Sequence, residues 1–252
     1  MKRLGLLVIG DEILAGHTQD TNTHWLAQQL KPMGILLARV EVCTDELGDL
    51  QSSMRRFLFD LDVDYVITSG GLGPTPDDRT MEALAAVLGV PLELRPEHEA
   101  WMHARAKAGY ERGRYDSPEP GPGVLKMAKL PAGTEPMPNG AGTALGCIAH
   151  HNGRQLFTLP GVPKEFQRMF LEAIAPRLET ATPLHTEELV LYSYESRFYE
   201  ALCELEAAFP SVTLGSYPME GYMVVRATGP QQDAAALIER MREIGAAFLQ
   251  KP

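Results

Sequence analysis

A ten-residue run rich in glycine and ending in two aspartates is the strongest candidate ligand-binding loop. It reads SGGLGPTPDD and follows a short apolar segment directly. Glycines let a backbone approach a ligand and present its N–H groups, while adjacent carboxylates favour a bound cation. A tight turn with an aspartate cap is the alternative, although such a turn needs only one or two special residues. The candidate ligand-binding residues are Ser69, Gly70, Gly71, Gly73 and Thr75, and Asp77 and Asp78 are candidate metal ligands and catalytic carboxylates.

A second group of carboxylates and amides follows the first apolar run of the chain. It reads GDEILAG from Gly10, and DTN follows from Asp20. Carboxylates and an amide with water suit a magnesium-type site, so Glu12 and Asp20 are candidate metal ligands. Gly10 and Asn22 are candidate substrate-binding residues. Helix capping by Asp20 beside a solvated acidic turn is the alternative.

Two further candidate segments adjoin predicted strands. In NGAGTALG, Gly142 and Thr143 could lie against a flat ligand or a phosphate, although glycine-rich hairpin entries are common. In LPGVPKE, the proline favours a helix start whose free N–H groups can receive an anion. Gly161 and Lys164 are therefore candidate substrate-binding residues, and Glu165 is a candidate base or metal ligand. A surface capping pair explains Lys164 and Glu165 equally well.

The elements that position these segments alternate between strand and helix. This order predicts a parallel sheet with right-handed crossovers, whose carboxyl edge brings the loops after successive strands together. The predicted strands are Arg3–Ile9, Ile35–Cys43 and Tyr65–Thr68, and the predicted helices are Asn22–Leu30, Asp49–Leu61 and Thr80–Leu88.

The second half of the chain predicts a hairpin, a linker and a small second domain. Asn152-Gly153 is a strong turn signal between Thr143–His150 and Arg154–Leu159. We expect a helical stretch after Pro96, a loop over Gly113–Gly123 and a helix after Pro163. Residues 1–176 then form the first domain, and residues 184–252 form a small β-α-β-β-α domain with strands Glu187–Tyr194, Val212–Tyr217 and Gly221–Ala227.

Composition narrows the ligand class. The 252 residues carry a formal net charge of −10, which argues against nucleic acid and anionic membranes as partners. No apolar run is long enough to span a bilayer, and the first strand lacks a cleavage site, so we expect a cytoplasmic protein. The three cysteines are far apart and predict reduced, partly buried thiols.

At its four motifs the chain resembles the CinA (competence/damage-inducible protein A) family. The matching residues are GDEILAG with DTN, SGGLGPTPDD with Thr80, NGAGTALG and LPGVPKE. The resemblance implies a three-layer α/β fold of molybdopterin-binding (MoaB/MogA-like) type with a second, small α+β domain. It also implies homodimers and metal-dependent hydrolysis of a nucleotide diphosphate, with ADP-ribose as substrate. Full-length members carry a further deamidase domain, which we do not expect in a chain ending at Pro252.

Two positions depart from the family pattern. Leu145 stands where the family has proline, and Val124–Met127 replaces part of a polar Asn-Arg-Lys-Gln-Ala-like segment. We therefore keep three hypotheses. The first is a hydrolase that uses Mg, Mn or Co to convert ADP-ribose to AMP and ribose 5-phosphate. The second is a non-catalytic module that binds molybdopterin or a nucleotide, and the third is a degenerate homologue that acts through a partner.

Overall fold

The computed structural model describes residues 2–251, which divide into two compact units. The larger unit contains the residues up to Gln28 and Leu36–Glu179, and the smaller contains Gln29–Ile35 and the residues from Thr180 onward. The strands are β1 (Lys2–Ile9), β2 (Ile35–Cys43), β3 (Tyr65–Ser69), β4 (Leu92–Leu94), β5 (Lys129–Pro131), β6 (Glu135–Met137), β7 (Gly146–His151), β8 (Arg154–Leu159), β9 (His185–Leu191), β10 (Thr213–Met219) and β11 (Tyr222–Gly229). The helices are α1 (Asp11–Leu14), α2 (Asn22–Leu30), α3 (Leu47–Arg55), α4 (Thr80–Leu88), α5 (Pro96–Glu111), α6 (Pro122–Lys126), α7 (Pro163–Met169), α8 (Tyr199–Ala208) and α9 (Gln231–Ile244).

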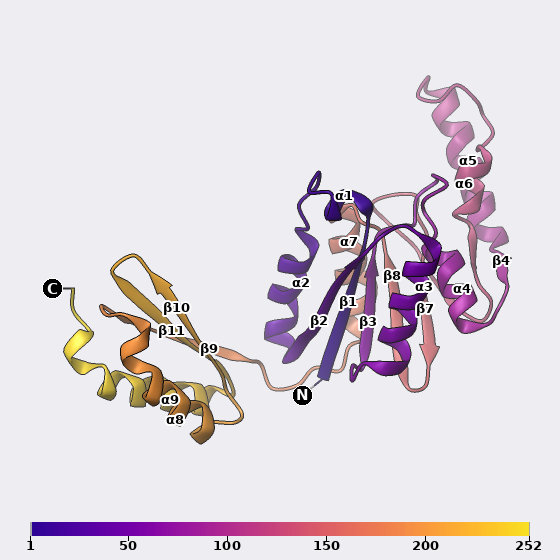
Figure 1. The fold of residues 1–252 in the computed structure, drawn as a ribbon. Helices are drawn as coiled ribbons and strands as arrows, with labels where there is room; N and C mark the ends of the chain where they lie inside the picture. The colour runs from indigo at the N-terminus through magenta and orange to yellow at the C-terminus, as the bar shows by residue number, and fades with distance from the viewer. Residues whose placement is uncertain (1, 252) are drawn as a thin grey trace. The chain divides into compact units, whose positions relative to one another are not determined.

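The larger unit is built on a six-stranded mixed sheet of order β2-β1-β3-β8-β7-β6 (Figure 1). β1, β3 and β8 run parallel, and the β7–β8 hairpin and β6 add antiparallel pairs. Val8 pairs with Ser69, and Ser69 pairs with Leu159. The three parallel strands therefore end at the same level, and the loops that follow them meet at one edge.

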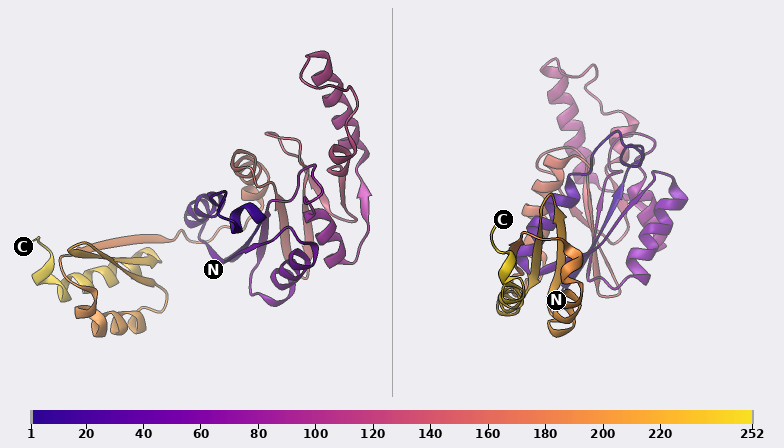
Figure 2. Two further views of the ribbon diagram at one scale, coloured as in Figure 1. Left: turned by 45° about the horizontal axis from the view of Figure 1, so that its top comes forward. Right: turned by 60° about the vertical axis from the view of Figure 1, so that its left-hand side comes forward.

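Helices cover both faces of this sheet, as the right-hand view of Figure 2 shows. On one face, buried side chains of α3 and α4, such as Leu50, Met54 and Leu84, share a core with Leu7 and Val66. On the other face, α2 packs against α7 and the turn that follows it. Trp25 meets Phe166 edge-on at 6.1 Å and Phe170 at 5.5 Å. The three-layer α/β architecture predicted from the sequence is confirmed.

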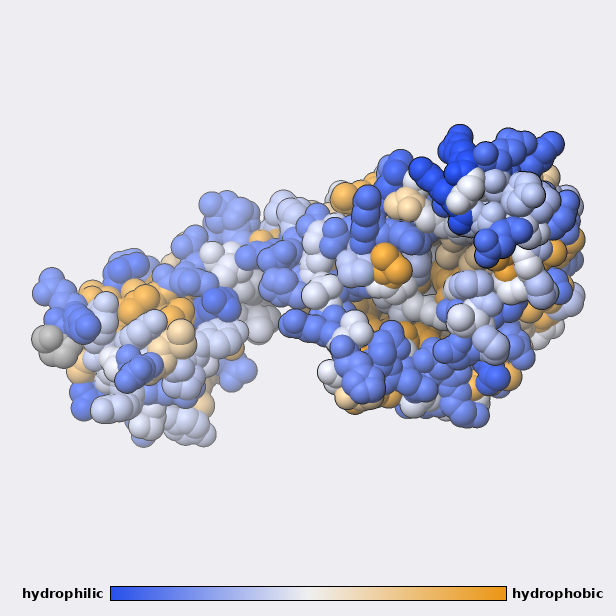
Figure 3. All heavy atoms as spheres, turned by 90° about the horizontal axis from the view of Figure 1, so that it is seen from above, coloured by the Kyte–Doolittle hydropathy of each residue, from blue (hydrophilic) through white to orange (hydrophobic). Residues whose placement is uncertain are grey.

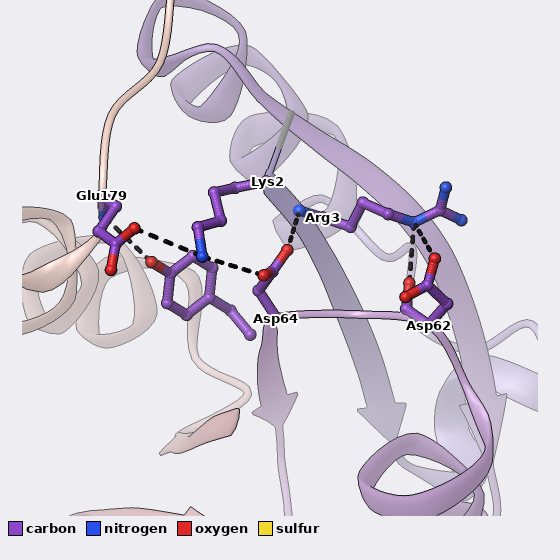
Figure 4. Close-up of polar contacts among 6 residues, drawn as sticks. Lys2, Arg3, Asp62, Asp64 and Glu179 are labelled. Atoms are coloured by element: carbon purple, nitrogen blue, oxygen red, sulfur yellow. Dashed lines mark hydrogen bonds and ion pairs between the residues drawn. The ribbon is translucent and has the colours of Figure 1, made fainter. Parts of the chain in front are cut away.

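The opposite edge of the sheet, where β1 and β3 begin, is held by an ion-pair cluster (Figure 4). Lys2 Nζ lies 3.1 Å from Asp64 Oδ1 and 3.4 Å from Glu179 Oε2. Partial burial opposes ionisation of Asp64, but hydrogen bonds from the Arg3 N–H and Lys2 outweigh it and lower the pKa of Asp64. The Tyr65 hydroxyl accepts the Glu179 N–H at 3.0 Å. These contacts fasten the last residue of the larger unit to its sheet.

The smaller unit contains an antiparallel sheet of order β10-β11-β9. Buried residues alternate along β11, and Met223, Val225 and Ala227 face a core completed by α8 and α9. Leu237 and Met241 supply the buried face of α9. The predicted β-α-β-β-α order is therefore present in this unit.

Several element limits differ from the sequence prediction. The third-last strand covers His185–Leu191 instead of Glu187–Tyr194, because the chain turns at Ser193. The helix predicted over Asp49–Leu61 is α3 followed by a π-helical turn over Arg56–Asp60. α6 begins inside the predicted loop Gly113–Gly123, and the short strands β4, β5 and β6 were not predicted. Among the residues described, no helix combines the length and apolarity needed to cross a membrane.

Candidate functional site

A cavity of about 1050 Å³ lies in the larger unit where the loops after β1, β3 and β8 meet. Figure 3 views this end of the strands, and hydrophilic side chains surround a recess with apolar residues inside it. α5 projects beyond the strand ends, and the chain after it contributes a further wall (Figure 1). The cavity is lined by ten of the residues singled out from the sequence: Gly10, Glu12, Gly70, Gly71, Gly73, Asp77, Asp78, Thr143, Gly161 and Glu165.

The shape of the glycine-rich loop depends on two positive-φ glycines and on Thr80. Gly70 has φ +119°, and a Cβ there would lie 2.2 Å from the Ile9 carbonyl oxygen. Gly71 has φ +66°, and a Cβ there would lie 2.2 Å from Thr80 Oγ1. The buried Thr80 hydroxyl donates to Gly70 O at 2.8 Å, and its N–H donates to Gly71 O at 3.1 Å. Larger residues cannot adopt this conformation without strain.

Asp78 closes the end of the same loop. Its Oδ2 accepts the Thr75 N–H at 2.8 Å and the Thr75 hydroxyl. Lys126 Nζ donates to the carbonyl oxygens of Thr75 and Asp78, the latter at 2.8 Å. A Cβ at Gly73 would lie 2.6 Å from Asp78 Oδ2. Asp78 and Lys126 therefore both shape the loop, and Thr75 lies outside the cavity lining.

Asp77 and three further carboxylates influence one another at the mouth of the cavity. Polar contacts within the Thr75–Asp78 turn lower the pKa of Asp77, whose carboxylate therefore stays ionised. Burial raises the pKa of Asp45, and the negative charges of Asp11, Glu12 and Asp77 raise it further. The Asp11 N–H opposes this shift by donating to Asp45 Oδ2 at 2.9 Å. This concentration of negative charge favours a bound cation.

Glu165 is fixed by a buried asparagine from another loop. Asn139 Nδ2 donates to Glu165 Oε2 at 2.5 Å, and Asn139 Oδ1 accepts the N–H groups of Ala141 and Gly142, each at 2.9 Å. A Cβ at Gly142 would lie 2.1 Å from Glu165 Oε2. Gly142 is therefore required for the close approach of this loop to Glu165, and it does not line the first cavity.

Asn22 lies beneath the cavity and joins two of its loops. Its side-chain Nδ2 donates to Ser69 Oγ at 3.1 Å and to Gly161 O at 2.9 Å. Asn22 and Ser69 are buried, and neither belongs to the cavity lining. Within residues 2–251 the buried Asn22 Oδ1 has no hydrogen-bond partner. The structure thus places both residues where they position loops.

Two further predicted residues, like Asn22, Ser69, Thr75 and Gly142, lie outside the cavity lining. The carboxylate of Asp20 accepts the Thr23 N–H at 3.0 Å and the Thr23 hydroxyl, which makes it a cap of α2. Lys164 is exposed in the first turn of α7. Asp20 as a metal ligand and Lys164 as a substrate-binding residue stay predictions that this arrangement does not favour.

The cavity also contains residues that the sequence did not single out. Asp45 comes two residues after β2, and its position behind a strand could have revealed it. Arg105 on α5 and Arg114 beyond it line the opposite wall. Neither arginine had a recognisable signal, because both belong to an excursion without a known motif. In total the lining contains seven carboxylates and these two arginines, an excess of five negative charges.

The segment that departs from the family pattern forms an apolar wall. Val124 and Met127 line the cavity and pack with Leu72 and Met102. Lys126, which the family pattern shares, holds the glycine-rich loop. Polar contacts expected from this segment are therefore replaced by apolar surface, while its structural contact with the loop is kept.

The donor set fits a hard divalent cation that is shared with a ligand. Carboxylate oxygens are the donors that magnesium and manganese prefer. In the described part of the chain, no three His, Cys, Asp or Glu side chains are close enough to hold a metal ion together. Magnesium commonly takes only one or two carboxylates and completes its shell with water and phosphate oxygens. Asp77, with Glu12 or Asp45 beside it, is suited to that arrangement.

Comparisons with known proteins define the class of this fold. Residues 5–180 match the family described as "Probable molybdopterin binding domain". The crystal structure of the protein CinA from Thermoplasma acidophilum is 34% identical in sequence, with a TM-score of 0.58, and the match covers 68% of this chain and 94% of that chain.

Sequence relatives name the family more closely. A CinA-like protein of Myxococcus xanthus is 33% identical over 92% of this chain and 56% of its own length. A CinA-like protein of Escherichia coli (strain SMS-3-5) is 35% identical over 94% of this chain and 58% of its own length. This chain belongs to the CinA family, and its larger unit is a domain of MoaB/MogA type. It spans just over half the length of these two relatives.

Proposed function

We propose that the first cavity binds a nucleoside diphosphate ester with a divalent cation (Mg, Mn or Co) and hydrolyses it. ADP-ribose is the leading substrate candidate. The supporting observation is the meeting of Glu12, Asp45 and Asp77 with the glycine-rich loop in one cavity. A diphosphate brings negative charge into an acidic cavity, so a cation must accompany it. The cavity volume of about 1050 Å³ is sufficient for a ligand of this size.

The residues of this chain have distinct roles in the proposed reaction. When bound, the cation would polarise a phosphate oxygen or a water molecule. Glu165, held by Asn139, would accept a proton from the attacking water. The water oxygen bonds to one phosphorus and the bridging P–O bond breaks, which yields AMP and ribose 5-phosphate from ADP-ribose. Arg105 and Arg114 oppose the negative charge of the ligand from the other wall.

A non-catalytic molybdopterin- or nucleotide-binding module is the second candidate. The family match supports this candidate more directly than it supports hydrolysis, because its description names molybdopterin binding alone. The same fold can carry a binding site in one protein and a catalytic site in another. Homodimer formation stays a prediction from the family resemblance.

Product analysis separates these candidates. Purified chain is incubated with ADP-ribose and Mg, Mn or Co, and AMP is followed by chromatography. Hydrolysis predicts AMP that appears with metal, disappears with EDTA and falls sharply in Asp77→Asn. Absence of product from ADP-ribose and from FAD with every metal contradicts the hydrolase. Saturable, metal-dependent binding of ADP-ribose without product would then support the binding module.

A further inference from the structure

A second cavity of about 930 Å³ lies in the larger unit beside the first. Its walls come from the start of α5 and from the segment between β6 and β7. Arg105 lines both cavities, and the loop that carries Thr143 into the first cavity contributes residues 140–142 to the second. No role in the proposed hydrolysis uses this space.

One wall of the second cavity is a row of stacked flat groups. His98, Trp101 and Arg105 follow one another at helical spacing on α5. The rings of His98 and Trp101 are stacked with centroids 5.1 Å apart and an interplanar angle of 20°. Arg105 Cζ lies 5.4 Å from the centre of the indole. This row presents a guanidinium group that is already oriented by an aromatic ring.

The row is anchored to the loop between the cavities. A ring nitrogen of His98, Nε2, lies 3.3 Å from the carbonyl oxygen of Thr143, to which it can donate as an N–H group. Burial lowers the pKa of His98, so the ring is neutral at pH 7 and adds no charge to the cavity. The opposite wall contains Pro136, Pro138 and the small residues 140–142. Small and cyclic side chains leave room for a flat ring between the walls.

The charge of the second cavity is the reverse of the first. Arg95 and Arg105 line it together with one carboxylate, Glu97. Arg95 Nη2 donates to the carbonyl oxygens of Pro131 at 3.3 Å and Thr134 at 3.1 Å, and its Nη1 lies 3.8 Å from Glu93 Oε2, so two of its three nitrogens are already engaged. Arg105 makes no hydrogen bond or ion pair within residues 2–251, and its N–H donors remain available. An anion can therefore bind here without a metal.

We propose that the second cavity is a metal-independent binding site for a planar aromatic ring that carries a phosphate group, the chemistry of a nucleoside monophosphate. The ring stacks on the guanidinium of Arg105, which itself lies over the indole of Trp101. The phosphate accepts hydrogen bonds from the N–H edge of Arg105. This site goes beyond the proposed hydrolysis and does not depend on it. The two cavities share Arg105, but none of the metal-binding carboxylates lines the second.

Tryptophan fluorescence tests the proposal, because Trp25 and Trp101 are the two tryptophans of the chain. In a Trp25→Phe background, Trp101 is the single reporter, and this residue is 39% exposed. The protein is titrated with AMP in EDTA. We expect a saturable change in emission, at least about tenfold weaker binding in Arg105→Gln, and similarly weaker binding of adenosine, since each loses a charge-assisted contact.

Two variants separate this cavity from the first. Ala141→Leu fills the second cavity without removing a charge, and we expect it to weaken AMP binding. Asp77→Asn alters the first cavity alone, and we expect AMP binding in EDTA to stay within about threefold of the parent, a change of less than 1 kcal/mol. If Trp25→Phe does not fold, calorimetric titration of the unmodified chain with AMP in EDTA gives the same comparison.

Three results overturn the proposal. The first is no AMP binding in EDTA by fluorescence or calorimetry. The second is binding that requires metal and is lost in Asp77→Asn but kept in Ala141→Leu, which would assign AMP to the first cavity. The third is Trp101 emission that responds to protein concentration and not to AMP, which would mean that a second copy of the chain covers this cavity.

Discussion

Asn139 Nδ2 lies 2.5 Å from Glu165 Oε2, although the two residues are 26 positions apart in sequence. The opposite end of the same amide accepts two backbone N–H groups of the loop that follows. Asn139 is 7% exposed, so water cannot readily replace these bonds. The position of the candidate base therefore depends on a residue that itself lines only the second cavity.

Asn139→Ala should lower the proposed hydrolysis by about tenfold or more, because Glu165 loses its fixed position. The change also leaves two N–H groups unpaired, which costs about 1–3 kcal/mol of stability. AMP release and urea unfolding measure the two effects. Asn139→Asp is the matched control: it keeps the acceptor for the loop but repels Glu165. We expect Asn139→Asp to regain loop stability and not activity; recovery of both would contradict the role given to Asn139.

Asp77 and Asp78 should differ although they are neighbours. Asp77 is exposed and ionised, whereas Asp78 accepts two hydrogen bonds from Thr75. Asp77→Asn should weaken metal-dependent ligand binding by about tenfold or more and leave the melting temperature unchanged. Asp78→Ala should weaken binding and also lower stability by about 1 kcal/mol, since the loop loses its cap. Calorimetric binding and thermal unfolding measure both; equal stability of the two variants would contradict the distinction.

His98 should make the larger unit less stable in mild acid. Burial lowers the pKa of His98, while its contact with Thr143 O opposes the shift. A histidine whose pKa is lower in the folded state than in the unfolded state stabilises the folded protein when the ring is neutral. Its contribution is therefore complete above the ordinary pKa near 6.5 and is lost as the pH falls below it. We expect the melting temperature of the parent to fall more steeply between pH 7 and pH 5 than that of His98→Gln. Parallel plots of melting temperature against pH for the two proteins would rule this out.

The three cysteines should differ in reactivity. Cys203 is exposed, whereas burial raises the pKa of Cys43 to about 12 and that of Cys147 to about 11. Because the thiolate is the reactive form, one thiol should react quickly with Ellman's reagent in the native protein. All three should react in guanidinium chloride. In Cys203→Ser the rapid native phase should disappear, and its persistence would show that a buried thiol is accessible.

Local sequence patterns predicted many of the helices and strands. The apolar segment before Gly10 becomes β1, and the helices Asn22–Leu30 and Thr80–Leu88 have the predicted limits. Such elements are predictable because their signals lie within one segment. The three-residue strands β4–β6 were not predicted, because each is defined by its pairing with another segment of the chain. The π-helical turn after α3 was not predicted either.

The sequence by itself determined which loops meet, because strands joined by right-handed crossovers place their carboxyl ends at one edge. It thereby predicted the glycine-rich loop, Glu12, Asp77 and Glu165 as parts of one site. Only the tertiary structure decided what each side chain does. Asp20 caps a helix and Asn22 joins two loops, while Asp45 and Arg105 enter the cavities. The type and spacing of residues define what a side chain can bind. Which group it contacts in the folded protein is decided by the packing of segments that are distant in sequence.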